Sequence, residues 1–256
     1  MKITVLGCGS SVGVPCLRYG WGDCDPKNLK NSRTRSSIII EKGNTTLLVD
    51  MSPDLRPQLL RYGAEKKIDA VIFTHEHYDH TNGINELRSV FLGTDRTLNV
   101  YTEESIAHNI YKMFYYLFQE TDNPIYKNYI SVNIIKDSFY IGDIFGNYFE
   151  QNHGFSKSMG LRIGNFAYTT DVISFPENSF AQLKNLDVWI VGCLSREEKP
   201  THANVELVLK WVNELKPKMV YLTHMDASMD YETLLKELPD NVRPAYDGLE
   251  IILNDE

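Results

Sequence analysis

The chain has 256 residues, of which 43% are hydrophobic and 23% charged, as is ordinary for one large globular domain. Its formal net charge of -8 argues against a general affinity for nucleic acid, because such binding needs a cationic surface that displaces counterions. We find no secretory h-region, no apolar stretch that could span a bilayer and no C-x-x-C spacing among four cysteines, and therefore expect a cytoplasmic protein.

The first third of the chain predicts strands and one helix. Apolar, β-branched segments at 2–6, 36–41 and 45–50 indicate strands, the last two separated by a Gly-Asn turn. The segment 52–63 ("SPDLRPQLLRYG") predicts a helix, since a capping serine, a proline and an aspartate stand at its start and a glycine at its end. The strand predicted at 69–75 ("DAVIFTH") runs into a group of histidines.

The middle of the chain is rich in aromatic residues. We expect a helix from residue 103 to about residue 120, and a helical, aromatic-rich insertion around 103–140. Its aromatic side chains suit a buried core, a dimer interface or a substrate lid, and the sequence leaves these alternatives open. His108, within this helix, is expected to be structural.

The last third predicts alternating strands and helices. Strands are expected at 166–171, 187–193 and 219–225, and the helix at 204–216 carries an apolar face at helical spacing. Together with the earlier strands this pattern predicts an α/β protein whose sheets are covered by helices.

Candidate metal ligands gather at the ends of these strands. The segment "THEHYDH" places His75, His77, Asp79 and His80 directly after a strand. An extended His-x-His pair projects both side chains the same way, and the turn that follows redirects the next two, so one segment can serve two metal ions. Imidazole and carboxylate ligands suit zinc or manganese, with iron as an alternative.

The sequence resembles the metallo-β-lactamase superfamily, whose signature is H-x-H-x-D-H after a strand. Within it, the chain is similar to the phosphonate-operon (PhnP-like) branch of cyclic-phosphate phosphodiesterases. The features that carry the resemblance span most of the chain: "GCGSSVGVP", "RTRSSIIIE", "LLVDMSPDLRPQLL", "THEHYDH", "YTTD", "PTHANVE", "LTHM" and "PAYDG".

The resemblance implies a single domain over 1–256 with a four-layer αββα sandwich and a binuclear metal site at one edge. It implies two divalent cations per chain, with Asp171 bridging them. The first cation would be held by His75, His77 and His153, and the second by Asp79, His80 and His224.

The candidate catalytic residues are Asp79, which is also a ligand, and His202 in "PTHANVE". The resemblance implies a non-ligand histidine at the position of His202, and we expect this residue to protonate the leaving group. The alternative is that His202 caps a helix or is solvated. Asp50 is expected to orient a ligand histidine.

These residues predict a metal-dependent hydrolase, most simply a phosphodiesterase that attacks a small, including cyclic, phosphodiester with a metal-bridging hydroxide. An acyl, thioester or lactone hydrolase is the main alternative, because the same hydroxide attacks a carbonyl. A tRNA 3′-processing nuclease, a redox protein and a non-catalytic scaffold are weaker alternatives. A small-molecule phosphate ester is the expected partner, without a membrane or nucleic acid, and a homodimer stays open.

Three further features are expected to lie outside the chemistry. "GCGSSVG" lacks the helix that a dinucleotide loop needs, so its glycines are expected to let the loop approach the metals. The basic segment 27–35 is expected to be a solvated loop, with a phosphate landing site as the alternative. Cys16 and Cys24 could hold a further zinc ion in the related enzymes' manner, but Ala227 stands where a histidine ligand would be needed.

Overall fold

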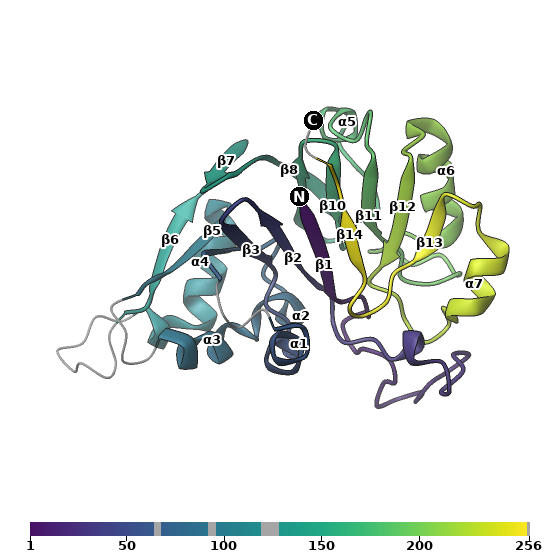
Figure 1. Ribbon diagram of the computed structural model, residues 1–256, viewed down its shortest axis with the longest axis horizontal. Helices are drawn as coiled ribbons and strands as arrows, with labels where there is room; N and C mark the ends of the chain where they lie inside the picture. Colours follow the sequence, from purple (N-terminus) through teal and green to yellow (C-terminus); the bar gives the residue numbers. More distant parts are fainter. Residues whose placement is uncertain (64–67, 92–95, 119–127, 255–256) are drawn as a thin grey trace.

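The computed structural model describes residues 1–63, 68–91, 96–118 and 128–254, and within these ranges the chain forms two seven-stranded mixed sheets (Figure 1). Helices α1 to α4 lie along the first sheet, and α6 and α7 lie beside the second (Figure 1). The two sheets with their helices form an αββα sandwich, as the family resemblance implied. None of the helices in the described ranges has the length and apolarity needed to cross a membrane.

The first sheet has the strand order β14-β1-β2-β3-β4-β5-β6. Strands β1 to β3 pair antiparallel, and β3 to β6 pair parallel. The strands are β1 (Lys2–Gly7), β2 (Ser37–Lys42), β3 (Thr45–Val49), β4 (Ala70–Ile72), β5 (Leu98–Thr102), β6 (Ile130–Ile134) and β14 (Glu250–Ile252). The helical segments that precede β6 in the chain are η1 (Leu29–Asn31, a 3-10 turn), α1 (Leu55–Tyr62), α2 (Tyr78–Thr81), α3 (Ile84–Phe91), α4 (Glu104–Met113) and η3 (Tyr115–Leu117, a 3-10 turn).

The second sheet has the order β13-β12-β11-β10-β9-β8-β7. Strands β7 to β10 pair antiparallel, whereas β10 to β13 pair parallel. The strands are β7 (Ser138–Ile141), β8 (Ile144–His153), β9 (Ser156–Ile163), β10 (Phe166–Thr169), β11 (Val188–Gly192), β12 (Met219–Thr223) and β13 (Val242–Pro244). The helices are α5 (Glu177–Ala181), α6 (Val205–Leu215) and α7 (Tyr231–Glu237).

Local sequence signals explain most element boundaries. Helix α1 ends at Gly63, whose φ of 66° is the left-handed conformation that glycine adopts without strain. The helix begins after Asp54, two residues later than its capping signal suggested, because the Ser52 hydroxyl accepts the Asp54 N–H in a turn that precedes it. Helix α6 buries the predicted apolar face together with Trp211.

The expectation of a helical insertion around 103–140 is only partly correct. Helix α4 and turn η3 occupy its first part, residues 119–127 lie outside the described part of the chain, and the segment from 130 onward forms strands β6 and β7. In β7, buried and exposed side chains alternate, as the period of two in a half-buried strand requires. The many aromatic residues of 103–140 suggested one helix, although the periodicity of the sequence changes from that of a helix to that of a strand within it.

Candidate metal centre

Four strands of the two sheets deliver the candidate ligands to one place. His75 follows β4, His153 ends β8, Asp171 follows β10 and His224 follows β12. Polar side chains that leave parallel strands at their carboxyl ends meet at the same edge of a sheet. The two sheets therefore bring residues 75 and 224, far apart in sequence, into one cluster.

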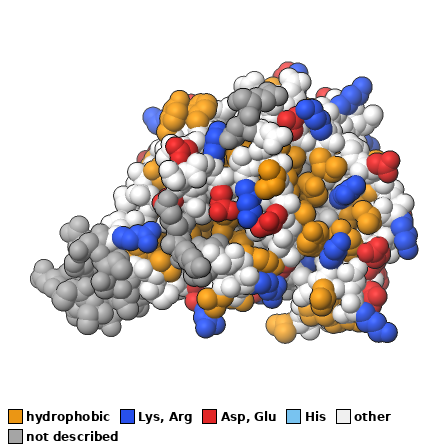
Figure 2. Space-filling view, in the orientation of Figure 1, with side chains coloured by type: hydrophobic (Ala, Val, Ile, Leu, Met, Phe, Trp, Pro, Cys, Tyr) orange, Lys and Arg blue, Asp and Glu red, His pale blue; other side chains and the backbone are white. Residues whose placement is uncertain are grey.

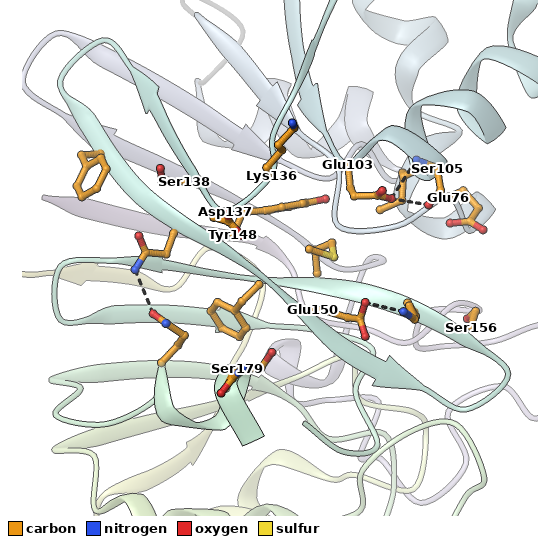
Figure 3. A pocket seen from close by; sticks show the side chains of 18 residues that line it. Glu76, Glu103, Ser105, Lys136, Asp137, Ser138, Tyr148, Glu150, Ser156 and Ser179 are labelled. Atoms are coloured by element: carbon orange, nitrogen blue, oxygen red, sulfur yellow. Dashed lines mark hydrogen bonds and ion pairs between the residues drawn. The ribbon is translucent and has the colours of Figure 1, made fainter. Parts of the chain in front are cut away.

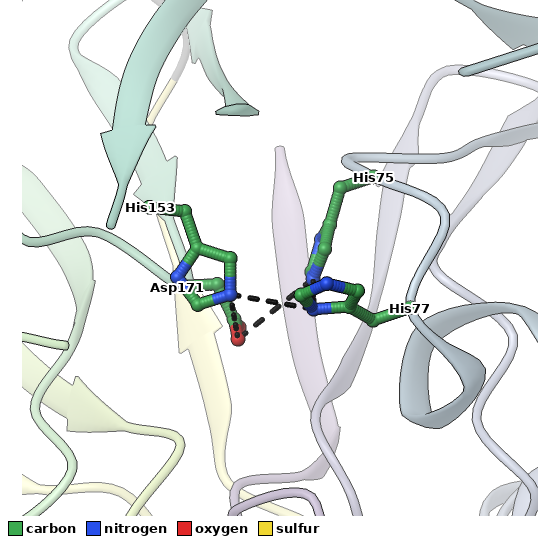
Figure 4. Close-up of side chains that lie close together, drawn as sticks. All are labelled: His75, His77, His153 and Asp171. Atoms are coloured by element: carbon green, nitrogen blue, oxygen red, sulfur yellow. Dashed lines mark hydrogen bonds and ion pairs between the residues drawn. The ribbon is translucent and has the colours of Figure 1, made fainter. Parts of the chain in front are cut away.

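The first group of donors consists of three imidazoles and one carboxylate (Figure 4). His75 Nε2 lies 3.1 Å from His77 Nδ1, and His153 Nε2 lies 3.3 Å from the same atom. Asp171 Oδ1 is 3.8 Å from His75 Nε2 and 3.7 Å from His153 Nε2. The four potential ligand atoms lie within 4.8 Å of one another, and the ring nitrogens point toward one another in Figure 4.

The second group shares Asp171 with the first. His80 Nε2 is 3.2 Å from Asp79 Oδ2 and 3.1 Å from Asp171 Oδ2. His224 Nδ1 lies 3.2 Å from the same Asp171 oxygen. Thus Oδ1 of Asp171 faces the first group and Oδ2 faces the second, which is the geometry of a bridging carboxylate.

Hydrogen bonds on the far side of the rings fix which nitrogen faces the first group. The Thr74 hydroxyl donates to Asp50, so its oxygen accepts from His75 Nδ1 at 3.0 Å. His153 Nδ1 donates to the Thr201 carbonyl oxygen at 2.8 Å. Both rings therefore keep Nε2 unprotonated toward the cluster, as metal coordination requires.

Asp50 orients a histidine ring of the second group by a hydrogen bond, as expected from the sequence. Its Oδ2 lies 2.7 Å from His80 Nδ1, and its carboxylate also accepts the backbone N–H and the hydroxyl of Thr74 at 2.8 Å each. One buried carboxylate thus holds His80 directly and His75 through Thr74. This link couples the orientation of a ligand in each group.

Three residues of the centre have left-handed backbone conformations: Asp50 with φ 61°, Asp171 with φ 51° and His224 with φ 58°. Each stands just after a strand, at the point where the chain turns toward the cluster. Non-glycine residues adopt such angles at a cost, and they do so most often at functional sites. At these three residues the backbone leaves the sheet and turns their side chains toward the cluster.

The donor set fits divalent cations. Among the described residues, His80 Nε2 is a buried atom without a hydrogen-bond partner, although oxygens of Asp79 and Asp171 lie 3.2 and 3.1 Å away. Burial lowers the pKa of His80, but these carboxylates and Asp50 outweigh it and raise that pKa well above its usual value. A bound cation would take the place of the proton on His80 Nε2 and would contact the same oxygens of Asp79 and Asp171.

The other ligands favour the protonation states that metal binding needs. Burial lowers the pKa of His75, His77 and His224, and for each of them at least one neighbouring imidazole adds to this. Burial raises the pKa of Asp79 and Asp171, but the surrounding histidines more than offset this and hold both pKa values below the usual range. Neutral imidazoles and ionised carboxylates are the ligating forms.

His202 lies beside the two groups without belonging to either. Its ring stacks on His224 at 5.0 Å between centroids, and its Nδ1 is 3.8 Å from Asp171 Oδ1. With Thr201, Tyr78 and Phe155 it lines an open cavity of about 440 Å³ whose floor is formed by ligands. Burial lowers the pKa of His202 to about 3, so the ring is neutral near pH 7 before a substrate enters.

A second cavity, of about 910 Å³, adjoins this one along strands β8 and β9 (Figure 3). Ser156, at the start of β9, lines both cavities. Glu103, Glu150 and Lys157 give the second cavity a charged lining, and the last two form an ion pair of 2.6 Å.

The basic segment proves to be structural. Arg33 is 2% exposed, and its guanidinium donates to the carbonyl oxygens of Met229 at 2.6 Å and Asp226 at 3.4 Å. Nη1 of Arg35 donates to both carboxylate oxygens of Asp54, at 2.9 and 3.0 Å. The expectation of a solvated loop is therefore wrong for these two arginines, because carbonyls and a carboxylate distant in sequence enclose them, and neither is free to receive phosphate.

The remaining sequence candidates lie apart from the centre. His108 is exposed on α4. Cys16 and Cys24 are buried free thiols, and Cys24 packs with Val14, Trp21 and Ala227 in a small apolar cluster. An apolar cluster is a poor setting for a cation, and the absence of a further zinc ion there stays a prediction.

Sequence analysis missed the residues that orient the ligands and shape the entrance. Thr74 and Thr201 contact ligand rings from outside, whereas the Ser36 hydroxyl lies 3.3 Å from His224 Nδ1, the nitrogen that also faces Asp171. Phe155 lies at the mouth of the cavity. Thr74 and Phe155 stand next to or near ligand histidines in sequence, but serine, threonine and phenylalanine carry no pattern that separates such roles from ordinary packing.

Residues 45–225 match the family model of the β-lactamase superfamily domain, so the chain belongs to the metallo-β-lactamase superfamily. All seven candidate metal ligands lie within this match. A crystal structure of a new diphosphatase from the PhnP family superposes with a TM-score of 0.90 and 28% identity, over 99% of this chain and 98% of that one.

Two relatives by sequence have other names. An octanoyltransferase of Porphyromonas gingivalis is 29% identical over all of this chain, and a probable metallo-hydrolase of Bacillus subtilis, YhfI, is 28% identical over 45% of it. The chain spans about half the length of these curated relatives, 52% and 43% respectively. The crystal structure of YhfI has the same fold, with a TM-score of 0.74 at 21% identity.

The donor arrangement leads to a first prediction, on metal content. Protein purified without chelator and supplied with zinc or manganese should contain about two metal ions per chain by elemental analysis, because two donor groups share one bridging carboxylate. Chelation should remove both ions and lower the melting temperature. A content that stays at one ion in folded, metal-replete protein would contradict the binuclear centre.

The second prediction concerns Asp171. Asp171→Asn removes the charge that faces both groups, so metal content should fall at both and turnover should be nearly lost. Glu150→Gln, which alters an exposed carboxylate outside the centre, is the matched control and should keep full metal content. Two bound ions and a normal rate in Asp171→Asn would show that another residue is the bridge.

Proposed function

We propose that this chain is a binuclear metal-dependent phosphodiesterase that hydrolyses a small phosphodiester, cyclic esters included. The observation that carries the proposal is His202, a non-ligand imidazole at the wall of the cavity whose floor is the metal centre. An alkoxide that leaves phosphorus needs a proton more than a thiolate does, and an imidazole is suited to supply one. The similarity to a diphosphatase over the whole chain supports chemistry at phosphorus.

In the proposed reaction, the protein orients the reactants around the phosphorus. When bound, two divalent cations supply a nucleophilic water near pH 7 and positive charge for the phosphoryl oxygens. Asp171 and Asp79 hold these charges in place, and Asp50 and Thr74 keep two ligand rings in register. His202 faces the same space from the cavity wall and donates its proton to the leaving oxygen.

His202 needs the substrate in order to act as an acid. The ring is neutral near pH 7 because burial holds its pKa at about 3. An anionic phosphodiester beside the ring favours the imidazolium, since a neighbouring opposite charge raises a histidine pKa. The proton is thus gained as the substrate binds and is given to the leaving group as the P–O bond breaks.

An acyl or thioester hydrolase is the second candidate, favoured by the octanoyltransferase that matches the whole of this chain. That relative is about twice as long, so its name describes a protein with much sequence outside the match. Nucleic acid is a weaker candidate substrate, because acidic and basic side chains are interspersed on the face drawn in Figure 2 and the net charge is -8. We take residues 1–256 as one domain, cytoplasmic, with zinc or manganese as the metal and iron as the alternative.

A substrate panel gives the third prediction. Metal-loaded protein should hydrolyse bis-para-nitrophenyl phosphate and cyclic phosphodiesters with a higher kcat/KM than octanoyl thioesters or lactones. Asp171→Asn protein prepared in the same way is the control for contaminating phosphatases. Faster hydrolysis of the thioester than of every phosphodiester would favour the acyl hydrolase instead.

The fourth prediction separates His202 from the ligands. His202→Ala should retain its metals and lose roughly 10²–10⁴ in rate on an alkyl phosphodiester, the usual size of a general-acid contribution. On a para-nitrophenyl ester the loss should be much smaller, because nitrophenolate leaves without a proton. Equal losses on both esters at unchanged metal content would make His202 a phosphate-binding residue and not the acid.

A further inference from the structure

The hairpin that carries one ligand also carries an exposed aromatic ring. His153 ends β8, Ser156 pairs with it at the start of β9, and Gly154 and Phe155 form the turn between them. Phe155 is 95% exposed, although it lines the cavity above the metal centre. A ring that is this exposed contributes little to folding through burial.

The position of this turn is set by the centre itself. Gly154 has a φ of 66° and lies so close to Thr201 that any side chain at this position would collide with it. The carbonyl of Thr201 also accepts the His153 ring N–H at 2.8 Å. Phe155 is therefore placed next to the loop of His202, on a backbone fixed by a ligand and by the residue that precedes the proposed acid.

A second aromatic ring lines the same cavity. Tyr78, directly after His77, is 47% exposed, and its hydroxyl donates to the Ser11 carbonyl oxygen at 2.6 Å. This hydrogen bond holds the ring against the first loop. The cavity thus has a polar floor of ligands and two partly or fully exposed aromatic rings on its walls. Its volume of about 440 Å³ is of the size that takes a small ligand.

We propose that Phe155 is a specificity-determining residue whose ring stacks on a planar aromatic group of the substrate. The phosphate would lie on the ligands and the planar group at the mouth, with Tyr78 on the other wall. The substrate class is then an aryl or nucleobase phosphoester rather than a purely aliphatic one. This inference rests on the proposed function and adds to it which organic group the phosphate carries.

The test measures binding, so that it does not depend on turnover. Metal-loaded protein is titrated calorimetrically with methyl benzylphosphonate and with methyl cyclohexylmethylphosphonate, which have the same charge and similar size and differ in planarity. The benzyl compound should bind about three- to tenfold more tightly, as expected for an aromatic pair. Phe155→Leu should abolish this ratio, and Phe155→Trp should keep or increase it.

A matched control and a second ligand pair complete the design. Tyr140→Leu removes a ring that is 74% exposed on β7, away from the centre, and should leave the ratio unchanged. The affinity ratio of adenosine 5′-monophosphate to ribose 5-phosphate separates a nucleobase from a simple aryl group as the preferred ring. Dependence of either ratio on Phe155 supports the proposal.

The outcomes that overturn the proposal are distinct from failure of the proposed function. The stacking role is wrong if neither phosphonate binds or if Phe155→Leu leaves both ratios at their original values. It is also wrong if Phe155→Leu instead dissociates a dimer in sedimentation without changing the ratios, since Phe155 would then contact a second copy. The proposed function fails separately, when the wild-type protein binds but does not hydrolyse any phosphodiester.

Discussion

A carboxylate enclosed by imidazoles is the constraint on which the rest of this structure depends. Asp171 is 2% exposed, the Thr170 hydroxyl donates to its carboxylate at 2.6 Å, and ring nitrogens of His80 and His224 lie 3.1 and 3.2 Å from it. An ionised carboxylate is very costly to bury unless positive charge or hydrogen bonds compensate it. Several of these rings favour the neutral form, so they orient the site more than they neutralise it. Divalent cations held by the two donor groups would supply the missing charge.

The two sheets solve the problem of placing this carboxylate and its partners. The first sheet contributes the segment after β4, and the second contributes the ends of β8, β10 and β12. Strands make a rigid frame, and the left-handed residues Asp50, Asp171 and His224 bend the chain at its edge. Asp50 then links ligands of both groups through Thr74. Rigid strands with bent ends give a precise arrangement without any need for long loops.

How much of this was predictable follows from where each signal lies in the sequence. The four candidate ligands of "THEHYDH" lie within six positions of one another, which makes the cluster visible in the sequence. Asp171 and His224 each end a segment that reads as an apolar strand, so a local pattern reveals them too. His153 ends a hairpin strand and has no such pattern, and only the family resemblance pointed to it.

Other features depend on contacts between distant residues, which one sequence does not display. In the sequence Arg33 looks like a solvated surface residue, but in the structure it donates to the carbonyl oxygens of Asp226 and Met229. Strand β7 is hard to see in the sequence because its alternation covers only four residues, and β6 has no strict alternation of buried and exposed side chains. The hydroxyls that orient the rings belong to residue types found everywhere in proteins. A cluster of histidines is visible in a sequence because histidine is a rare residue. The serine and threonine residues that contact the histidine rings are common, so their role is not visible.

The division of the ligands between the two sheets has a consequence for how the protein responds to its surroundings. Four candidate ligands follow β4 in one sheet and three follow strands of the other, so a cation held among them fastens the sandwich across its open edge. Each tenfold rise in free metal above the dissociation constant then adds about 1.4 kcal/mol per ion to the free energy of unfolding. The folded fraction of the chain would then depend on metal supply, so a shortage of metal would lower the amount of folded protein as well as its activity.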